Sequence, residues 1–407
     1  MITSLFDLDR VVQEASVRLA NARRTLAVAS FSPEADPPDN PLARFRSTLL
    51  KATLDELKAV PDPLLGPALA PHLGRLILDR VLWDHEAAMA RSWATPCVHI
   101  PDGLTLPALP KEVLADRRAS IITPRQALCV LLVDPEDVRR RQIAEAFARA
   151  ARGHLRDPAL VYAERRGRAA AQLGLALDSI DLPAPASAVD AAAVDFLAAT
   201  APIAERFAPW DKALFSSMAH GAVGGWPAHL SPRWVMEVFA GTDLGRPGAI
   251  VYARLPSALG GMSFARALGA FGEAFGEANL PRSAPFAIAR PVVDLRALRI
   301  GMVFALLVGE QVFARRTLAL GQGPAREHAR TFARAWGAHG RGFAAAARTH
   351  PALFPPRDNL EDRFCEFTTQ AWGEPLPGAL AGYCRASIER PARASRRFCL
   401  PRSIAKA

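Results

Sequence analysis

Hydrophobic positions recur mostly three and four residues apart along the chain, which is the spacing of an amphipathic helix. Strand-like alternation is confined to "IPDGLTLPALP" (100–110), which has room for a short hairpin, and to "AIVYARL" (249–255). The pattern predicts a mainly α fold, a large helical bundle with at most a small β-hairpin or short sheet. The predicted helices are 8–30, 42–60, 63–93, 135–155, 158–174, 187–207, 262–279, 294–320, 323–349, 358–371 and 375–390.

Proline-rich segments separate these helices. "FSPEADPPDNP" (31–41) and "VPDPLLGP" (60–67) are predicted connectors, because proline fixes φ and lacks an N–H donor. "LDSIDLPAPASA" (177–188) is the most plausible hinge. We therefore predict two helical lobes around a cleft, an N-terminal lobe over 1–180 and a C-terminal lobe over 181–407.

Composition agrees with a helical protein that buries a large core. Half of the 407 residues are hydrophobic and 22% are charged, and Ala, Leu, Arg and Glu outnumber β-formers such as Tyr. The cysteines form no CxxC pair, so we expect free thiols in a reducing compartment; they are Cys97, Cys129, Cys365, Cys384 and Cys399. The longest apolar run, 300–309, is about half of a membrane span. With acidic residues where a signal peptide is apolar, this predicts a cytoplasmic protein.

The chain is basic, with a net charge of +10 and a pI near 10.0. Arginine is concentrated in 136–156, 313–341 and the tail 384–407. Solvated basic helix faces explain this pattern, and so does binding to nucleic acid or an anionic surface. No zinc knuckle, aromatic sheet motif or helix-turn-helix signature accompanies the arginines, so we favour the solvated faces and do not expect a nucleic-acid partner.

The predicted helix in "FARALGAFGEAFGEANLP" (264–281) contains three glycines, Gly269, Gly272 and Gly276. Each glycine in a helix interior costs about 1 kcal/mol relative to alanine. Two explanations are open. Either this helix packs very closely against a neighbour, or it is the remnant of a segment that once carried other residues at these positions.

The order of segments around this helix resembles the catalytic half of the helical zinc oligopeptidases, the thimet-oligopeptidase-like group. A β-like run leads into "ALGAFGEAFGEANLP" (267–281), followed by "DLRALRIGMVFALLVGEQVFARRTLALG" (294–321), a long helix and "NLEDRFCEFTTQAWGEPLPGAL" (359–380). The resemblance covers about 110–390. In that family two histidines of an HExxH helix bind zinc, its glutamate is the general base, and a glutamate of a later helix is the third ligand.

This chain departs from the motif where the family does its chemistry. The first histidine falls on Gly269, the general base on Ala270, the second histidine on Glu273 and the third ligand on or near Ile300, while the motif glycine is kept as Gly272. Glycine, alanine and isoleucine offer no side-chain ligand to zinc. The resemblance therefore implies a retained fold without zinc. It also implies a binding cleft at Gly269, Ala270, Gly272, Glu273, Gly276 and Ile300.

Four other residues are candidates for chemistry of a different kind. Glu273 and Glu277 are four residues apart, so their carboxylates share one helix face and suit an acid–base pair, although a polar stripe facing nearby arginines explains them too. His220 and His229 flank the loop "GAVGGWPA" and are candidate metal ligands, with Glu273 or Glu277 as a third ligand, although packing or capping beside Trp and Pro explains them too.

The sequence contains one HE pair, His85–Glu86, but Met89 stands where an HExxH motif has its second histidine. A place on a solvated helix face is the expected explanation of this pair.

Three functions are consistent with these observations. The first, which we favour, is a catalytically inactive relative of a metallopeptidase that binds a peptide or protein partner in the cleft. The second is an active hydrolase that uses Glu273, Glu277, His220 and His229. The third is a nucleic-acid or anionic-surface binder that uses the arginine-rich helices.

Overall fold

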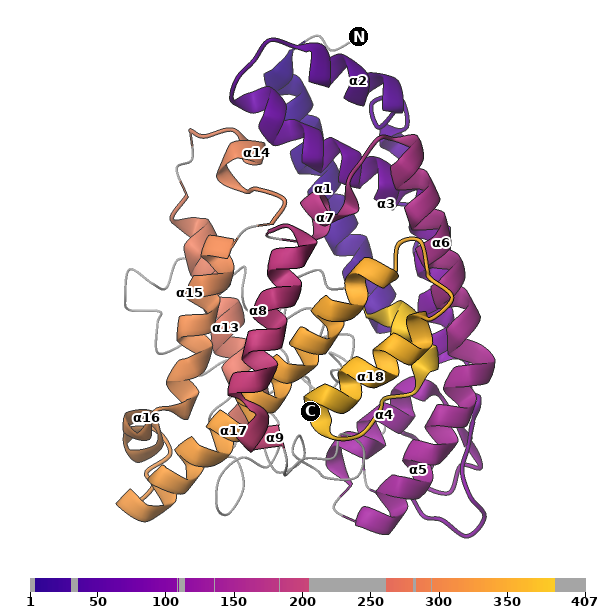
Figure 1. The fold of residues 1–407 in the computed structure, drawn as a ribbon, viewed down its shortest axis with the longest axis vertical. Coiled ribbons are helices and arrows are strands. Elements are labelled where there is room, and N and C mark those ends of the chain that lie inside the picture. The colour runs from indigo at the N-terminus through magenta and orange to yellow at the C-terminus, as the bar shows by residue number, and fades with distance from the viewer. Residues whose placement is uncertain are drawn as a thin grey trace.

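The computed structural model describes residues 4–30, 36–107, 109, 114–134, 136–182, 184–204, 261–280, 283–293 and 295–384. It is mainly helical, as predicted, with one two-stranded antiparallel sheet among the described residues (Figure 1). The strand-like run 249–255, together with His220 and His229, lies outside these ranges.

The elements up to residue 204 are as follows: α1 (Leu5–Ala29), the 3-10 helix η1 (Ala43–Phe45), α2 (Lys51–Ala59), α3 (Leu65–Ala94), β1 (Val98–His99), β2 (Ile121–Ile122), α4 (Pro124–Val133), α5 (Asp137–Ala150), the π-helix η2 (Ala151–Leu155), α6 (Arg156–Gln172), α7 (Leu177–Asp181), α8 (Ala186–Ala199) and α9 (Ala201–Ala204). After residue 260 they are α13 (Gly261–Ala278), α14 (Phe286–Ala289), α15 (Leu295–Leu306), η4 (Leu307–Gly309), α16 (Gln311–Arg316), α17 (Gln322–Thr349), η5 (His350–Ala352), α18 (Leu360–Trp372) and η6 (Gly378–Tyr383).

Local signals explain several helix boundaries. Asp62 accepts hydrogen bonds from the backbone N–H groups of Leu64, Leu65 and Gly66 at 2.9, 2.5 and 3.1 Å, so its carboxylate satisfies free donors at the start of α3. These bonds, led by the one from Gly66, lower the pKa of the Asp62 carboxyl. Thr123 and Gln126 form a reciprocal capping box at the start of α4.

The small sheet lies beside the segment predicted to hold it. Val98 pairs with Ile122 and His99 with Ile121, so the strands flank 100–110 instead of lying within it. The prediction of a hairpin inside 100–110 was therefore wrong. Prolines 101 and 107 have no N–H to donate to a ladder, which explains why the pairing stops at its edge.

Three helical predictions were wrong in part. Of the predicted helix 375–390, the described residues contain only the 3-10 helix η6, Gly378–Tyr383. The predicted helix 294–320 is interrupted after Leu306, since η4 and a turn separate α15 from α16. Phe332 of α17 packs against Gly309 so closely that a Cβ there would collide with its ring. The predicted helix 42–60 is α-helical only over Lys51–Ala59. The helix α4 was not predicted, because its residues are mostly apolar and show no clear helical period.

The long helix α3 runs through the N-terminal half and packs on α1, α2 and α6, while α17 packs on α8 and α18. One core joins residues from both sides of position 180, for example Phe147 and Leu155 with Leu353, Phe364 and Leu380. The division into lobes 1–180 and 181–407 stays a prediction, and this shared core ties described residues of both together.

Candidate functional site

The three glycines of α13 face α15 at very short range. A Cβ on Gly272 would lie 2.7 Å from the Phe304 ring and 2.9 Å from the Ile300 carbonyl oxygen. A Cβ on Gly269 would lie 3.2 Å from the carbonyl oxygen of Gly301, and one on Gly276 would lie 3.0 Å from Ile300 Cδ1. Close helix packing therefore explains the glycines without reference to a lost metal ligand.

The same contact contains the other residues of the predicted cleft. Ala270 is buried in the α13 core, and the Glu273 methylene group lies over Gly301 of α15. Along this face, α15 occupies the space that a bound peptide would need. The side chain of Glu277 lies outside the described part of the chain, as do His220 and His229, so their meeting with Glu273 stays a prediction.

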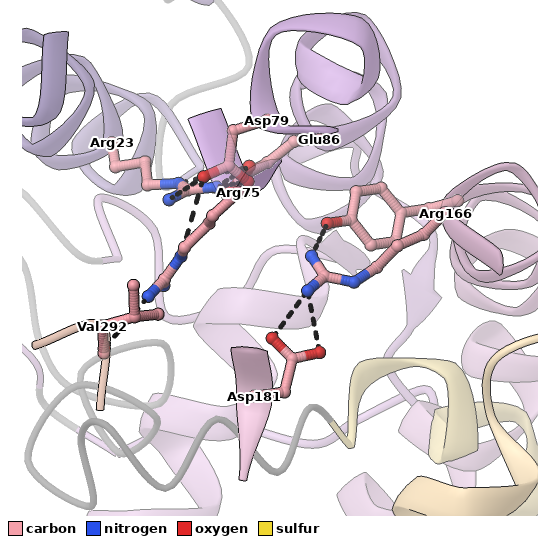
Figure 2. Close-up of polar contacts among 8 residues, drawn as sticks. Arg23, Arg75, Asp79, Glu86, Arg166, Asp181 and Val292 are labelled. Atoms are coloured by element: carbon pink, nitrogen blue, oxygen red, sulfur yellow. Dashed lines mark hydrogen bonds and ion pairs between the residues drawn. The ribbon is translucent and has the colours of Figure 1, made fainter. Parts of the chain in front are cut away.

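The HE pair of α3 does not lie on a solvated face, and that prediction was wrong for its glutamate. Glu86 is buried and binds Arg23 of α1, whose guanidinium also binds Asp79, two turns nearer the start of α3 (Figure 2). The distances from Arg23 Nη2 are 2.8 Å to Glu86 Oε2 and 2.7 Å to Asp79 Oδ1. Burial opposes the charge on Arg23, but the two carboxylates outweigh it and raise the pKa of the guanidinium well above its ordinary value.

A second buried pair lies between α6 and α7. Arg166 Nη2 donates to both oxygens of Asp181 at 2.6 and 2.8 Å, and Arg166 Nη1 donates to the Tyr162 hydroxyl (Figure 2). His350 is buried beside this pair, with Nε2 3.9 Å from Asp178 and Nδ1 without a hydrogen-bond partner among the described residues. Burial lowers the pKa of His350.

An open groove of about 470 Å³ lies between the start of α3, α7 and the segment from α14 to the start of α15. Eleven of its twelve lining residues are apolar, and the exception is Ser179: Leu64, Pro67, Ala68, Pro71, Ser179, Leu182, Ala287, Ile288, Pro291, Val292, Val293 and Leu295. Leu64 is 71% exposed and Ile288 is 43% exposed. The volume is within the range of ligand-binding sites, which are mostly apolar.

Side chains of α1 and α3 hold the wall 286–292 of this groove. Asp9 accepts hydrogen bonds from the N–H groups of Phe286 and Ala287 at 2.7 and 2.9 Å and so caps α14. His72 Nε2 lies 2.8 Å from the Arg290 carbonyl oxygen. Arg75 extends from α3 toward Val292 and donates to its carbonyl oxygen at 3.5 Å, while its Nε lies 3.9 Å from Asp79 (Figure 2).

Many arginines of the basic helices have structural partners. In α5, Arg139 pairs with Asp134 and Glu136, and Arg140 pairs with Asp137. Arg341 of α17 is buried and donates to backbone carbonyls of α18 and α8. These arginines therefore do not belong to solvated basic faces, because their side chains bind carboxylates or backbone carbonyls of the protein.

The described residues hold no group of three or more His, Cys, Asp or Glu side chains placed to bind a metal ion. Their cysteines are free thiols, and burial raises the pKa of Cys97 and of Cys384, the latter to about 12. A raised pKa disfavours the nucleophilic thiolate. Within the same part of the chain, every helix is too short or too polar to cross a membrane.

The hydrophobic spacing predicts α3, the long helix that lines the groove, but no pattern in the sequence predicts the groove itself. Prolines occur on both sides of the groove. Pro67 and Pro71 lie at the predicted connector and the start of the helix after it, and Pro291 follows α14. Nothing in the sequence indicates that Asp9 and His72 bind a segment more than 200 residues away. No protein-family model, curated protein or solved structure matches the chain.

Proposed function

We propose that the protein is a non-catalytic binding protein that holds an apolar segment of a peptide or protein partner in the groove between α3, α7 and the wall 286–292. The observation that carries this proposal is the lining, in which eleven of twelve side chains are apolar and two, Leu64 and Ile288, are well exposed at the surface. Exposed apolar side chains that gather around a hollow are typical of binding surfaces.

The anchoring of the wall supports binding with little rearrangement. Asp9, His72 and Arg75 fix backbone atoms of 286–292 to helices α1 and α3. A wall that is already ordered loses little conformational entropy when a partner binds. The lining favours apolar anchors such as Leu, Phe or Pro in the partner, because Ser179 is the only lining residue with a polar side chain.

Relationship to the zinc oligopeptidases stays a prediction, and the proposal does not depend on it. The cytoplasm is the proposed compartment, which the free thiols of the described cysteines support. The hydrolase alternative rests on Glu273, Glu277, His220 and His229, and assays of each alanine variant against a mixed peptide library test it.

The experiment is a selection of peptides from a random display library on the full-length protein. The selected peptides should carry apolar anchors, and they should bind at least tenfold more weakly to Ile288→Glu, which adds a charge at the groove, and to Ala68→Phe, which fills it. Val161→Glu is the matched control, because Val161 is 42% exposed on α6 and does not line the groove.

Equal affinity for wild type, Ile288→Glu and Ala68→Phe would remove the groove from the proposed function. If the purified protein contains stoichiometric zinc and cleaves a mixed peptide library, the proposal that it is non-catalytic is wrong.

A further inference from the structure

A second apolar surface lies on α15, beginning two turns after Leu295 of the groove. Of the large hydrophobic side chains of α15 and η4, four are well exposed, namely Met302 at 39%, Val303 at 62%, Leu306 at 40% and Leu307 at 44%. Positions 302, 303, 306 and 307 share one side of the helix, since residues three and four apart are neighbours on its surface. We name these four residues the α15 ridge.

Arginines lie at both ends of the ridge. Arg296 and Arg299 precede it on α15, and Arg315 and Arg316 follow on α16; all four are exposed. Between residues 295 and 316 the chain has one carboxylate, Glu310. No described residue forms an ion pair or hydrogen bond with Arg299, Arg315 or Arg316 in the structure, so these guanidinium groups are available to carboxylates of a partner.

The opposite side of α15 is fixed to α13. The carbonyl oxygen of Gly269 would lie 2.8 Å from a Cβ on Gly301, and Phe304 stacks at an angle on Phe271 with ring centroids 5.6 Å apart. Figure 1 shows α15 on the outer edge of the molecule beside α13, with α16 beyond its far end. The ridge is therefore presented on a helix that is held rigidly from behind.

We propose that the α15 ridge docks an acidic amphipathic helix of a partner protein. The partner would place apolar residues at i, i+3, i+4 and i+7 on Met302, Val303, Leu306 and Leu307. Its Asp or Glu residues would reach Arg299 at one end and Arg315 or Arg316 at the other. Arginine favours this chemistry, because its planar guanidinium binds carboxylates in a bidentate manner.

The arginines around the ridge and the narrow width of its apolar face favour an acidic helix over two other occupants, a second copy of the chain and a membrane surface. A second copy of the chain would add the same excess of arginine to the contact, which costs free energy by like-charge repulsion. A membrane-surface helix buries a wide apolar face in the lipid interface. Here four apolar side chains form the exposed apolar face, and the opposite side of α15 packs against α13.

The test selects binders from a display library of random 16-residue helical peptides on the full-length Ile288→Glu protein, in which the groove is disabled. Selected peptides should have an apolar stripe flanked by Asp or Glu. One such peptide, synthesised with a fluorophore, should lose at least tenfold in affinity on Val303→Glu and on Leu306→Glu. It should lose severalfold on Arg299→Glu and on raising the salt from 50 to 300 mM, since exposed charges are screened.

Val161→Glu is again the control and should leave the affinity unchanged. The proposal is overturned if no peptide is enriched or if the enriched peptides lack an acidic excess. It is also overturned if Val303→Glu and Leu306→Glu, both shown to be folded by circular dichroism, bind as well as the parent. Vesicles with 30% anionic lipid should not bind; binding that depends on Val303 would assign the ridge to a membrane instead. The selection on the Ile288→Glu protein tests the α15 ridge independently of the groove, because this substitution already disables the groove. If the groove proposal fails, the test of the ridge is therefore still valid.

Discussion

At the scale of single residues, the glycines of α13 have a physical explanation in the structure. Two helix backbones approach so closely at Gly269, Gly272 and Gly301 that a methyl group would touch a carbonyl oxygen or an aromatic ring. The sequence alone left close packing and lost metal ligands as alternatives, because a glycine is compatible with both. The short distances from a Cβ on Gly272 to Ile300 and Phe304 support close packing as the explanation.

Gly272→Ala is expected to lower the free energy of unfolding by about 1–3 kcal/mol, the usual cost of overpacking a core. The added Cβ would lie 2.7 Å from Phe304 Cδ2 and 2.9 Å from the Ile300 carbonyl oxygen, so the two helices would have to separate. Urea unfolding followed by circular dichroism measures the change. Gly323→Ala in α17 is the control, because a Cβ there meets no atom within 4 Å. If Gly272→Ala is as stable as this control, the packing explanation is wrong.

His350 is expected to make the protein less stable as the pH falls. Burial lowers the pKa of its imidazole below the ordinary value of 6.5, so around and below pH 6.5 the unfolded chain binds a proton more readily than the folded protein does. Well above pH 6.5 the imidazole is neutral in both states and the effect vanishes. Below it, stability falls by at most about 1.4 kcal/mol per pH unit until the folded pKa is reached.

Unfolding free energies of wild type and His350→Phe, compared at half-unit steps from pH 8 to pH 5, isolate this contribution. The difference between the two proteins should be constant above pH 7 and should shift in favour of the variant below pH 6.5. A difference that stays constant over the whole range would show that His350 titrates alike in both states.

At the scale of elements, the groove depends on contacts between helices that are distant in the sequence. The short helix α14 is capped by Asp9 of α1, and His72 of α3 lies against the carbonyl oxygen of Arg290. A four-residue helix is not stable by itself in water. The wall 286–292 therefore owes its position to α1 and α3.

Asp9→Ala is expected to loosen the wall without unfolding the molecule. Removing the carboxylate leaves the N–H groups of Phe286 and Ala287 without their acceptor, and a hydrogen bond to a charged group contributes about 1.5–3 kcal/mol. Amide hydrogen exchange in 286–290 should accelerate about 10- to 100-fold. Peptides selected on the groove should bind more weakly as well.

Asp7→Ala is the matched control, because Asp7 is exposed on the same helix. Equal exchange rates in 286–290 for Asp9→Ala and wild type would show that the wall is held by other contacts.

The helices themselves could be predicted, and the contacts between them could not. The three- and four-residue spacing correctly predicts long elements such as α13 and α17, whose amphipathic faces are clear. It fails where tertiary packing overrides local preference, as at Gly309 and Phe332, and where a strand pair is two residues long. The burial of Glu86 depends on Arg23 of another helix, so no local pattern reveals it.

At the scale of the whole molecule, two apolar surfaces differ in the charges around them. The groove is lined mostly by apolar side chains and is framed by α3, α7 and α14, whereas the apolar α15 ridge has arginines at its ends. Ion pairs tie two of these framing helices to others: Arg23 of α1 pairs with Asp79 of α3, and Arg166 of α6 pairs with Asp181 of α7 (Figure 2). Such pairs, when fully hydrogen-bonded, contribute to a single well-defined arrangement of the helices that carry them.

Site-specific photo-cross-linking tests the central claim, binding of an apolar segment in the groove, most directly. A benzophenone amino acid in place of Leu64, which is 71% exposed at the groove, should cross-link to a peptide selected on the wild-type protein. The same amino acid in place of Val161 should not, and Ile288→Glu should abolish the cross-link at position 64. A peptide that binds but cross-links equally at positions 64 and 161, or still cross-links at 64 in Ile288→Glu, would contradict the account.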